Sequence, residues 1–80
     1  MNGIVLGQRL RLLRQREGMS QADLARALKI TSNGLNLLEL GKIDDPHISR
    51  VVRAASLFRV SADYLLGLAE TKASGEHLPS

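Results

Sequence analysis

The sequence contains no cysteine and only two aromatic residues, Phe58 and Tyr64, among its 80 positions. Without cysteine, disulfide scaffolds, thiolate metal sites and cysteine nucleophiles are excluded. Two aromatic rings are too few for a protein that binds single strands by stacking bases on its side chains. No apolar run approaches the roughly 20 residues that a membrane helix needs, and residues 1–7 lack the pattern of a secretory signal. These absences predict a small cytoplasmic domain without a membrane partner, whose core is held by packing alone.

The composition that remains is typical of one globular domain. Apolar residues make up 44% of the chain and its formal net charge is +3, whereas disordered chains have fewer apolar residues and more net charge. The end of the chain differs, because it is rich in Ser, Gly and Pro and cannot bury enough apolar area to become ordered. We therefore expect a folded domain over residues 1–69 and a flexible polar tail over residues 70–80.

Apolar residues near the start of the chain recur at helical spacing. Leu6, Leu10 and Leu13 would lie on one face of a helix that runs from about residue 5 to residue 17. Gly18 is expected to end this helix.

Capping residues mark the starts of the later helices. Ser20, with Asp23 three residues on, resembles a capping box, and Thr31 is the next N-cap. Asp45 before Pro46 predicts the start of the fourth helix, because proline is tolerated in a first helical turn. The expected apolar stripe of that helix is Ile48, Val51, Val52 and Ala55, and Ser61 is expected to cap a short fifth helix. Five short helices without a strand pattern predict an all-α fold, a compact five-helix bundle.

The segment of residues 20–41 consists of two short predicted helices joined by a tight turn. It begins SQADLA, continues with LKIT at the turn, and ends LLELG. This ordered set strongly resembles the helix-turn-helix of the phage-repressor and Cro-like (XRE) family of transcription regulators. The resemblance covers about residues 6–67 and includes Arg14 and the closing segment VSADYLLG. It implies the DNA-binding fold of that family and a protein of bacterial or phage origin.

The resemblance also implies a surface for double-stranded DNA. The second motif helix would enter the major groove, where Asn33 would bond an adenine edge and Leu37 would make only apolar contact, as to a thymine methyl group. Gln21 would lie over the DNA backbone at the start of the first motif helix. The full set of DNA-binding residues implied in this way is Arg14, Gln21, Thr31, Ser32, Asn33, Asn36, Leu37 and Lys42.

One further feature matches the family pattern and two depart from it. Arg14 and Glu39 match positions that form a partly buried ion pair between the first helix and the recognition helix. Where the family usually has glycine after the first motif helix and after the fourth helix, this chain has Lys29 and Arg59, which are expected to adopt left-handed backbone. Gly34 lies within the recognition helix, and it predicts a soft helix until DNA is bound.

No catalytic, metal or cofactor site is predicted, so we expect a protein that is not an enzyme. Nothing pairs a serine with a histidine as nucleophile and base, and no glycine loop of the phosphate-binding type is present. His47 beside Asp44 and Asp45 offers too few ligands for a metal, and is expected to be an exposed residue of a first helical turn. The arginines interpreted as solvated charges are Arg9, Arg11, Arg50, Arg53 and Arg59.

Two functions from different classes stay open. The first is a sequence-specific transcription regulator, a repressor that binds a palindromic operator as a homodimer; restriction–modification controllers are a related role at this size. Its dimer contact is expected at the fifth helix and the loop before it, through Phe58, Tyr64, Leu65 and Leu68. The second is an antitoxin-like or partner-binding module on the same fold, which would dock a protein on Leu37 and Leu40. The salt dependence of binding distinguishes the two functions. Phosphate contacts make the affinity for DNA fall steeply as salt rises, whereas a largely apolar protein interface should not respond in this way.

Overall fold

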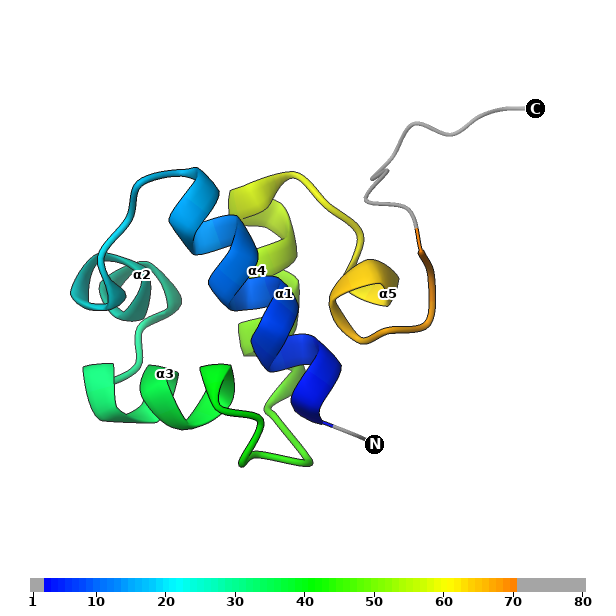
Figure 1. The fold of residues 1–80 in the computed structure, drawn as a ribbon, viewed down its shortest axis with the longest axis horizontal. Helices are drawn as coiled ribbons and strands as arrows, with labels where there is room; N and C mark the ends of the chain where they lie inside the picture. Colours follow the sequence, from blue (N-terminus) through cyan, green and yellow to red (C-terminus); the bar gives the residue numbers. More distant parts are fainter. Residues whose placement is uncertain (1–2, 71–80) are drawn as a thin grey trace.

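The computed structural model describes residues 3–70, which contain five α-helices. They are α1 (Gly3–Arg16), α2 (Gln21–Leu28), α3 (Ser32–Glu39), α4 (Ile48–Phe58) and α5 (Ala62–Leu65). Figure 1 shows α1 crossing in front of α4, with α2 and α3 together at one end and α5 at the other. No residue in the described range is in a strand, and the predicted all-α five-helix bundle is confirmed. Of the predicted tail, only Glu70 lies within the described residues.

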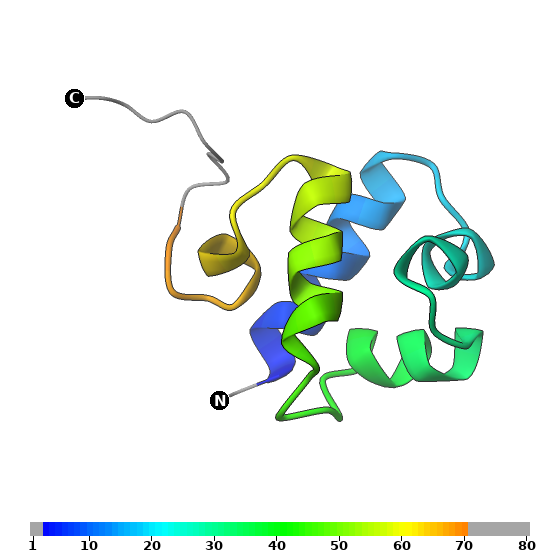
Figure 2. The same ribbon diagram turned by 180° about the vertical axis from the view of Figure 1, so that it is seen from behind.

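One apolar core joins these helices. α1 packs on α3 and on α5, and α2 packs on α3. α4 lies behind α1 in the view of Figure 1 and packs on α5 and on α2 (Figure 2). Leu6, Leu10 and Leu13 are buried, as the spacing in α1 predicts. The other buried apolar side chains are Leu24, Ala25, Leu28, Leu35, Leu38, Val51, Ala54, Ala55, Val60, Tyr64 and Leu65. None of the helices in residues 3–70 is both long and apolar enough to span a bilayer.

Local hydrogen bonds set several helix ends where the sequence predicts them. The Ser20 hydroxyl accepts from the Asp23 N–H at 3.0 Å, and the Asp23 carboxylate accepts from the Ser20 N–H at 3.3 Å. The backbone N–H of Ser20, and then its hydroxyl, lower the pKa of the Asp23 carboxyl below its ordinary value, because both stabilise the charged carboxylate. The Ser61 hydroxyl caps α5 by accepting from the Tyr64 N–H at 2.9 Å, without a reciprocal carboxylate. Lys29 and Arg59 follow α2 and α4 with φ angles of 60° and 57°, so the left-handed backbone predicted for both is confirmed.

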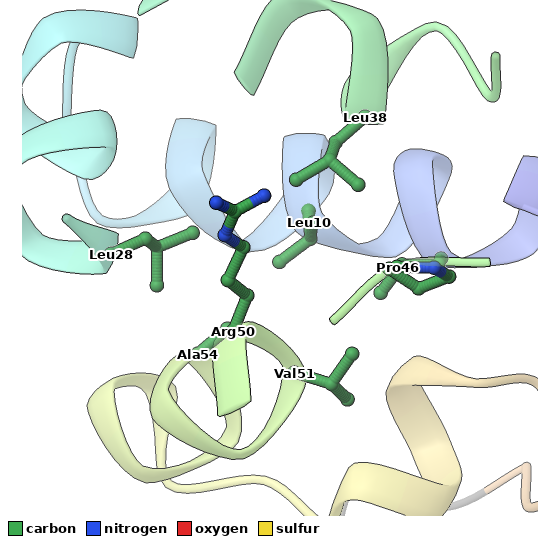
Figure 3. Close-up of a pocket in the computed structure, with 8 residues that line it drawn as sticks. Leu10, Leu28, Leu38, Pro46, Arg50, Val51 and Ala54 are labelled. Atoms are coloured by element: carbon green, nitrogen blue, oxygen red, sulfur yellow. The ribbon is translucent and has the colours of Figure 1, made fainter. Parts of the chain in front are cut away.

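The start of α4 differs from the prediction. The helix begins at Ile48 behind an N-cap at His47, not at Asp45 and Pro46, and the His47 side chain makes no capping hydrogen bond. Pro46 instead lines an apolar gap beside α1 (Figure 3). Pro46 therefore packs in the loop that precedes the helix and does not occupy its first turn.

The buried face of α4 also differs from the predicted stripe. Ile48 and Val52 are 65% and 54% exposed, whereas Val51, Ala54 and Ala55 are buried. The core facing α4 is already filled by leucines of α1, α2 and α3, and the side of α4 that meets them carries the smaller side chains of Val51, Ala54 and Ala55. Apolar spacing alone does not distinguish this face from the adjacent one.

Arg50 of α4, interpreted from the sequence as a solvated charge, is half-buried. It extends toward a cavity of about 10 Å³ between the first four helices, whose other lining residues are apolar (Figure 3). The aliphatic stem of an arginine can cover apolar surface while its guanidinium reaches water. The cavity has room for about one water molecule, so it is a packing gap and not a ligand site.

The interpretation of Arg9 as a solvated charge is wrong. Its guanidinium lies over the Tyr64 ring, 4.2 Å from the ring centroid. It donates hydrogen bonds to the carbonyl oxygens of Tyr64 and Ala69, and it pairs with Glu70 at 3.4 Å. Arg9 therefore fastens the segment that follows α5 to α1. These partners lie 55 to 61 residues away in the chain, so the pattern within α1 contains no sign of them.

Two glycines allow α1 to lie directly against the backbone of the last turn of α3 and of the loop that follows it. A Cβ atom on Gly7 would lie 2.3 Å from the carbonyl oxygen of Leu38, and one on Gly3 would lie 2.0 Å from that of Ile43. A side chain at Gly7 would push α1 away from α3, and one at Gly3 would push it away from the loop that follows α3. The sequence analysis missed this role, because a glycine inside a helix considered alone is only unfavourable.

Candidate nucleic-acid interface

α2 and α3 are the two helices of the predicted motif (Figure 1). The Ile30 N–H donates to the Ala25 carbonyl at 2.9 Å and closes the turn behind the left-handed Lys29. Ala25 is buried, and its small side chain lets the two helices approach. The Thr31 hydroxyl then accepts from the Gly34 N–H at 3.0 Å and caps α3. These bonds within the turn fix the direction in which α3 leaves α2.

The exposed face of α3 is polar at its start and apolar at its end. Thr31, Ser32 and Asn33 are exposed at the first turn. Asn33, Leu37 and Leu40 recur at helical spacing and share the side of α3 that is turned away from the core. Leu37 is half-buried and Leu40 is 53% exposed. The buried residues on the opposite side are Leu35, Leu38 and Glu39.

Glu39 is a buried charge, and Arg14 of α1 pairs with it. Arg14 Nε donates to Glu39 Oε2 at 2.6 Å and Arg14 Nη2 donates to Oε1 at 3.1 Å, which gives a two-pronged contact. The side chains of Arg14 and Glu39 are only 13% and 3% exposed. Arg14 Nη1 also donates to the Met19 carbonyl at 2.9 Å. The structure thus contains the ion pair that the resemblance implies, and the pair joins α1 to α3 and to the loop before α2.

Gln21 belongs to the same network, which the sequence analysis did not anticipate. Its Nε2 donates to Glu39 Oε1 at 3.1 Å and to Asn36 Oδ1 at 3.3 Å. An amide nitrogen carries two hydrogens, so both are used inside the protein. The side-chain amide expected to meet a DNA phosphate is therefore occupied in this structure. It fixes the orientation of Asn36 instead, which leaves Asn36 Nδ2 as a donor.

The loop between α3 and α4 carries charges of both signs. Lys42, Asp44 and Asp45 are all exposed, and His47 is exposed at its end. Among residues 3–70, no group of three or more His, Cys, Asp or Glu side chains is arranged to hold a metal ion. The loop thus places one cation after the end of α3, with two acidic residues close by in sequence.

The residues expected to form a dimer contact are mostly unavailable for one. Tyr64 and Leu65 are 6% and 0% exposed, and Phe58 packs against the core. Only Leu68 of the predicted set is largely exposed, at 70%. α5 is a single turn and is held by burial of its own apolar residues, so these cannot also face a partner.

Comparison with known proteins places this motif in a family. Residues 5–66 match the family of helix-turn-helix domains. The chain is 37% identical over 71 residues to the HTH-type transcriptional regulator ImmR of Bacillus subtilis (strain 168). That match covers 89% of this chain and 55% of ImmR, so the chain spans about half the length of this relative.

Two solved structures of regulators share the fold. SinR, the master regulator for biofilm formation, in its complex with DNA matches with a TM-score of 0.69 and 26% identity, over 76% of this chain and 97% of the SinR chain. The restriction–modification controller protein C.AhdI from Aeromonas hydrophila matches with a TM-score of 0.69 and 25% identity, over 79% of this chain and 94% of its own. This is a family of DNA-binding regulators and not a class of enzymes. The chain belongs to the helix-turn-helix family of XRE-type transcription regulators.

Proposed function

We propose that the chain binds a specific operator with α3 in the major groove and the first turn of α3 against the base edges. The observation that carries this proposal is an exposed turn of Thr31, Ser32 and Asn33 on a helix that is held from behind by a buried ion pair. Base readout requires a fixed orientation of α3, because its side chains must lie within hydrogen-bond distance of the bases. The match to SinR, whose structure was solved with DNA, supports the proposal.

Contacts to the DNA backbone would lie on both sides of this turn. The N–H groups of Gln21 and Ala22 lie in the first turn of α2, have no acceptor within that helix, and can donate to a phosphate. Asn36 offers its Nδ2, and Lys42 offers a cation after the end of α3. Arg14 acts mainly through Glu39 in this proposal, and its small exposed part adds positive charge at the edge of the surface.

The chain would act as a homodimeric repressor on a palindromic operator. Proteins with this motif bind two half-sites about 34 Å apart, one helical turn, with a recognition helix in each. In place of the buried Tyr64 and Leu65, a second copy would pack on Ile48 and Val52 and in the shallow hollow between α4 and the start of α5. Occupation of promoter DNA by this dimer would block transcription.

A protein-docking role is the second candidate function. The observation that favours it is the exposed Leu40 beside the half-buried Leu37 at the apolar end of α3. An antitoxin-like module would use this surface to bind a partner protein. Its affinity would change little with salt, because such an interface displaces few counterions.

Selection from a random pool of double-stranded DNA at near-physiological salt tests the first function. The expected product is a palindrome with half-sites one helical turn apart, bound with an affinity that falls steeply as salt is raised. Recovery of no sequence above background, or an affinity that does not respond to salt, would contradict the proposal and direct the search to protein partners of Leu37 and Leu40.

Replacing Asn33 with alanine is expected to weaken binding to the selected operator by about 1–3 kcal/mol, roughly 5- to 150-fold. Asn33 is exposed and its amide makes no hydrogen bond within residues 3–70, so the fold should be unchanged. Fluorescence anisotropy with the operator and with a scrambled duplex measures the effect. Gln8→Ala, on the exposed side of α1, is the control. An equal loss on both duplexes, or no loss on either, would remove Asn33 from the base-reading surface.

A further inference from the structure

The side chains that α3 exposes are all uncharged. Its sequence, SNGLNLLE, contains no lysine, arginine or aspartate, and its one glutamate is Glu39. The Glu39 side chain is 3% exposed and is held by Arg14. Lys29 and Lys42 belong to the turns before and after the helix. The face that α3 presents outward therefore consists of amide, hydroxyl and apolar groups.

Each base edge in the major groove suits particular side chains. Guanine accepts hydrogen bonds from Arg or Lys and cytosine donates to Glu or Asp, whereas adenine pairs with Asn or Gln and the thymine methyl group makes apolar contacts. α3 exposes no charged side chain for guanine or cytosine. It presents Asn33 and, one turn further along the same side, Leu37. The hydroxyls of Thr31 and Ser32 can bond to either kind of base pair, so they do not alter this balance.

We infer that α3 recognises A·T base pairs, with Asn33 bonded to an adenine and Leu37 packed on a thymine methyl group. The Asn33 amide is not engaged within residues 3–70, so both its oxygen and its nitrogen are available to adenine. Leu37 is half-buried, so the protein sets its position while part of its surface stays open. The two side chains lie four residues apart, about 6 Å along the helix, and meet base pairs within one or two steps of each other. This inference rests on the proposed function, because it requires α3 to lie in the major groove.

The test replaces thymine with deoxyuridine, which lacks only the methyl group, at one position of the selected operator at a time. The dissociation constant is measured for the full chain and for Leu37→Ala and Leu40→Ala. Uracil at one such position, in one half-site, is expected to weaken binding of the unmodified protein about fourfold, the effect of burying one methyl group. Leu37→Ala should bind the thymine and uracil operators equally. Leu40→Ala, which changes the same residue type at the end of α3, should keep the fourfold ratio.

The outcomes separate this inference from the proposed function. An A·T-rich half-site with a methyl effect that disappears in Leu37→Ala supports the inference. A specific operator with G·C pairs beside α3, or one in which no uracil substitution weakens binding, overturns it and leaves DNA binding intact. A methyl effect that persists in a folded Leu37→Ala protein overturns the role of Leu37. Failure to select any sequence overturns both. Thermal unfolding reports whether each variant folds. The uracil scan of the unmodified protein tests the inference even if neither variant folds.

Discussion

Gly7→Ala is expected to destabilise the protein by about 3 kcal/mol or more, because overpacking against atoms that cannot move is costly. The new Cβ would lie 2.3 Å from the Leu38 carbonyl oxygen and 2.7 Å from that of Glu39. Both oxygens belong to backbone, so α1 and α3 must separate to remove the overlap. That separation would also strain the Arg14–Glu39 pair that joins the same helices. For a domain of this size the change corresponds to a fall in Tm of roughly 12–24 °C, measured by circular dichroism.

Gly34→Ala is the matched control, because it makes the same change inside another helix. The nearest atom to its new Cβ is the Thr31 hydroxyl oxygen at 3.2 Å. Alanine favours helix by about 1 kcal/mol over glycine, so this variant should melt near or above the unmodified protein. Equal melting temperatures for Gly7→Ala and Gly34→Ala would show that the contact between α1 and α3 does not constrain the fold.

Glu39→Gln is expected to cost about 3 kcal/mol of stability, because it leaves the largely buried Arg14 guanidinium, whose side chain is 13% exposed, without a countercharge. Glutamine keeps the shape of the side chain, so the loss reflects charge and hydrogen bonding. Glu39 accepts from Arg14 and also from Gln21, at 3.1 Å, so the change also loosens the contact between α2 and α3. Unfolding in urea measures the free-energy change, and operator binding of the folded fraction reports whether α3 keeps its position.

Two control variants test whether the loss of stability in Glu39→Gln comes from the unpaired charge of Arg14. Glu17→Gln removes an exposed carboxylate just after α1 and should change stability by less than about 0.5 kcal/mol. The double variant Arg14→Met with Glu39→Leu replaces the whole pair by apolar side chains and should recover much of the loss. Native stability and native operator affinity in Glu39→Gln would show that the pair neither supports the fold nor orients the recognition helix.

The side-chain contacts that hold α3 in place show which features of the candidate site could be predicted from the family resemblance. The resemblance implies the Arg14–Glu39 pair, and the structure contains it. The side-chain bonds of Gln21 were not implied, because they depend on how closely α2 and α3 pack. The roles of Asn33 and Leu37 toward DNA stay predictions, which the selection and uracil experiments address.

The sequence by itself determined the helices and most of their ends, because capping and periodicity act over a few residues. Ser20, Thr31 and Ser61 each accept a hydrogen bond from the N–H three positions later, and Lys29 and Arg59 end their helices as expected. These capping interactions depend only on residues that are close together in the sequence, so they can be predicted from it.

Only the tertiary structure decided which side of α4 is buried, where α4 begins, and what Arg9 and Gly7 contact. Arg9 reaches a carbonyl 55 residues away, and Gly7 lies against the backbone of Leu38. Such contacts depend on the distance between helices that are remote in the chain. That distance is set by how all the core side chains pack together, because a close-packed interior leaves each helix few positions in which voids and overlaps are both avoided.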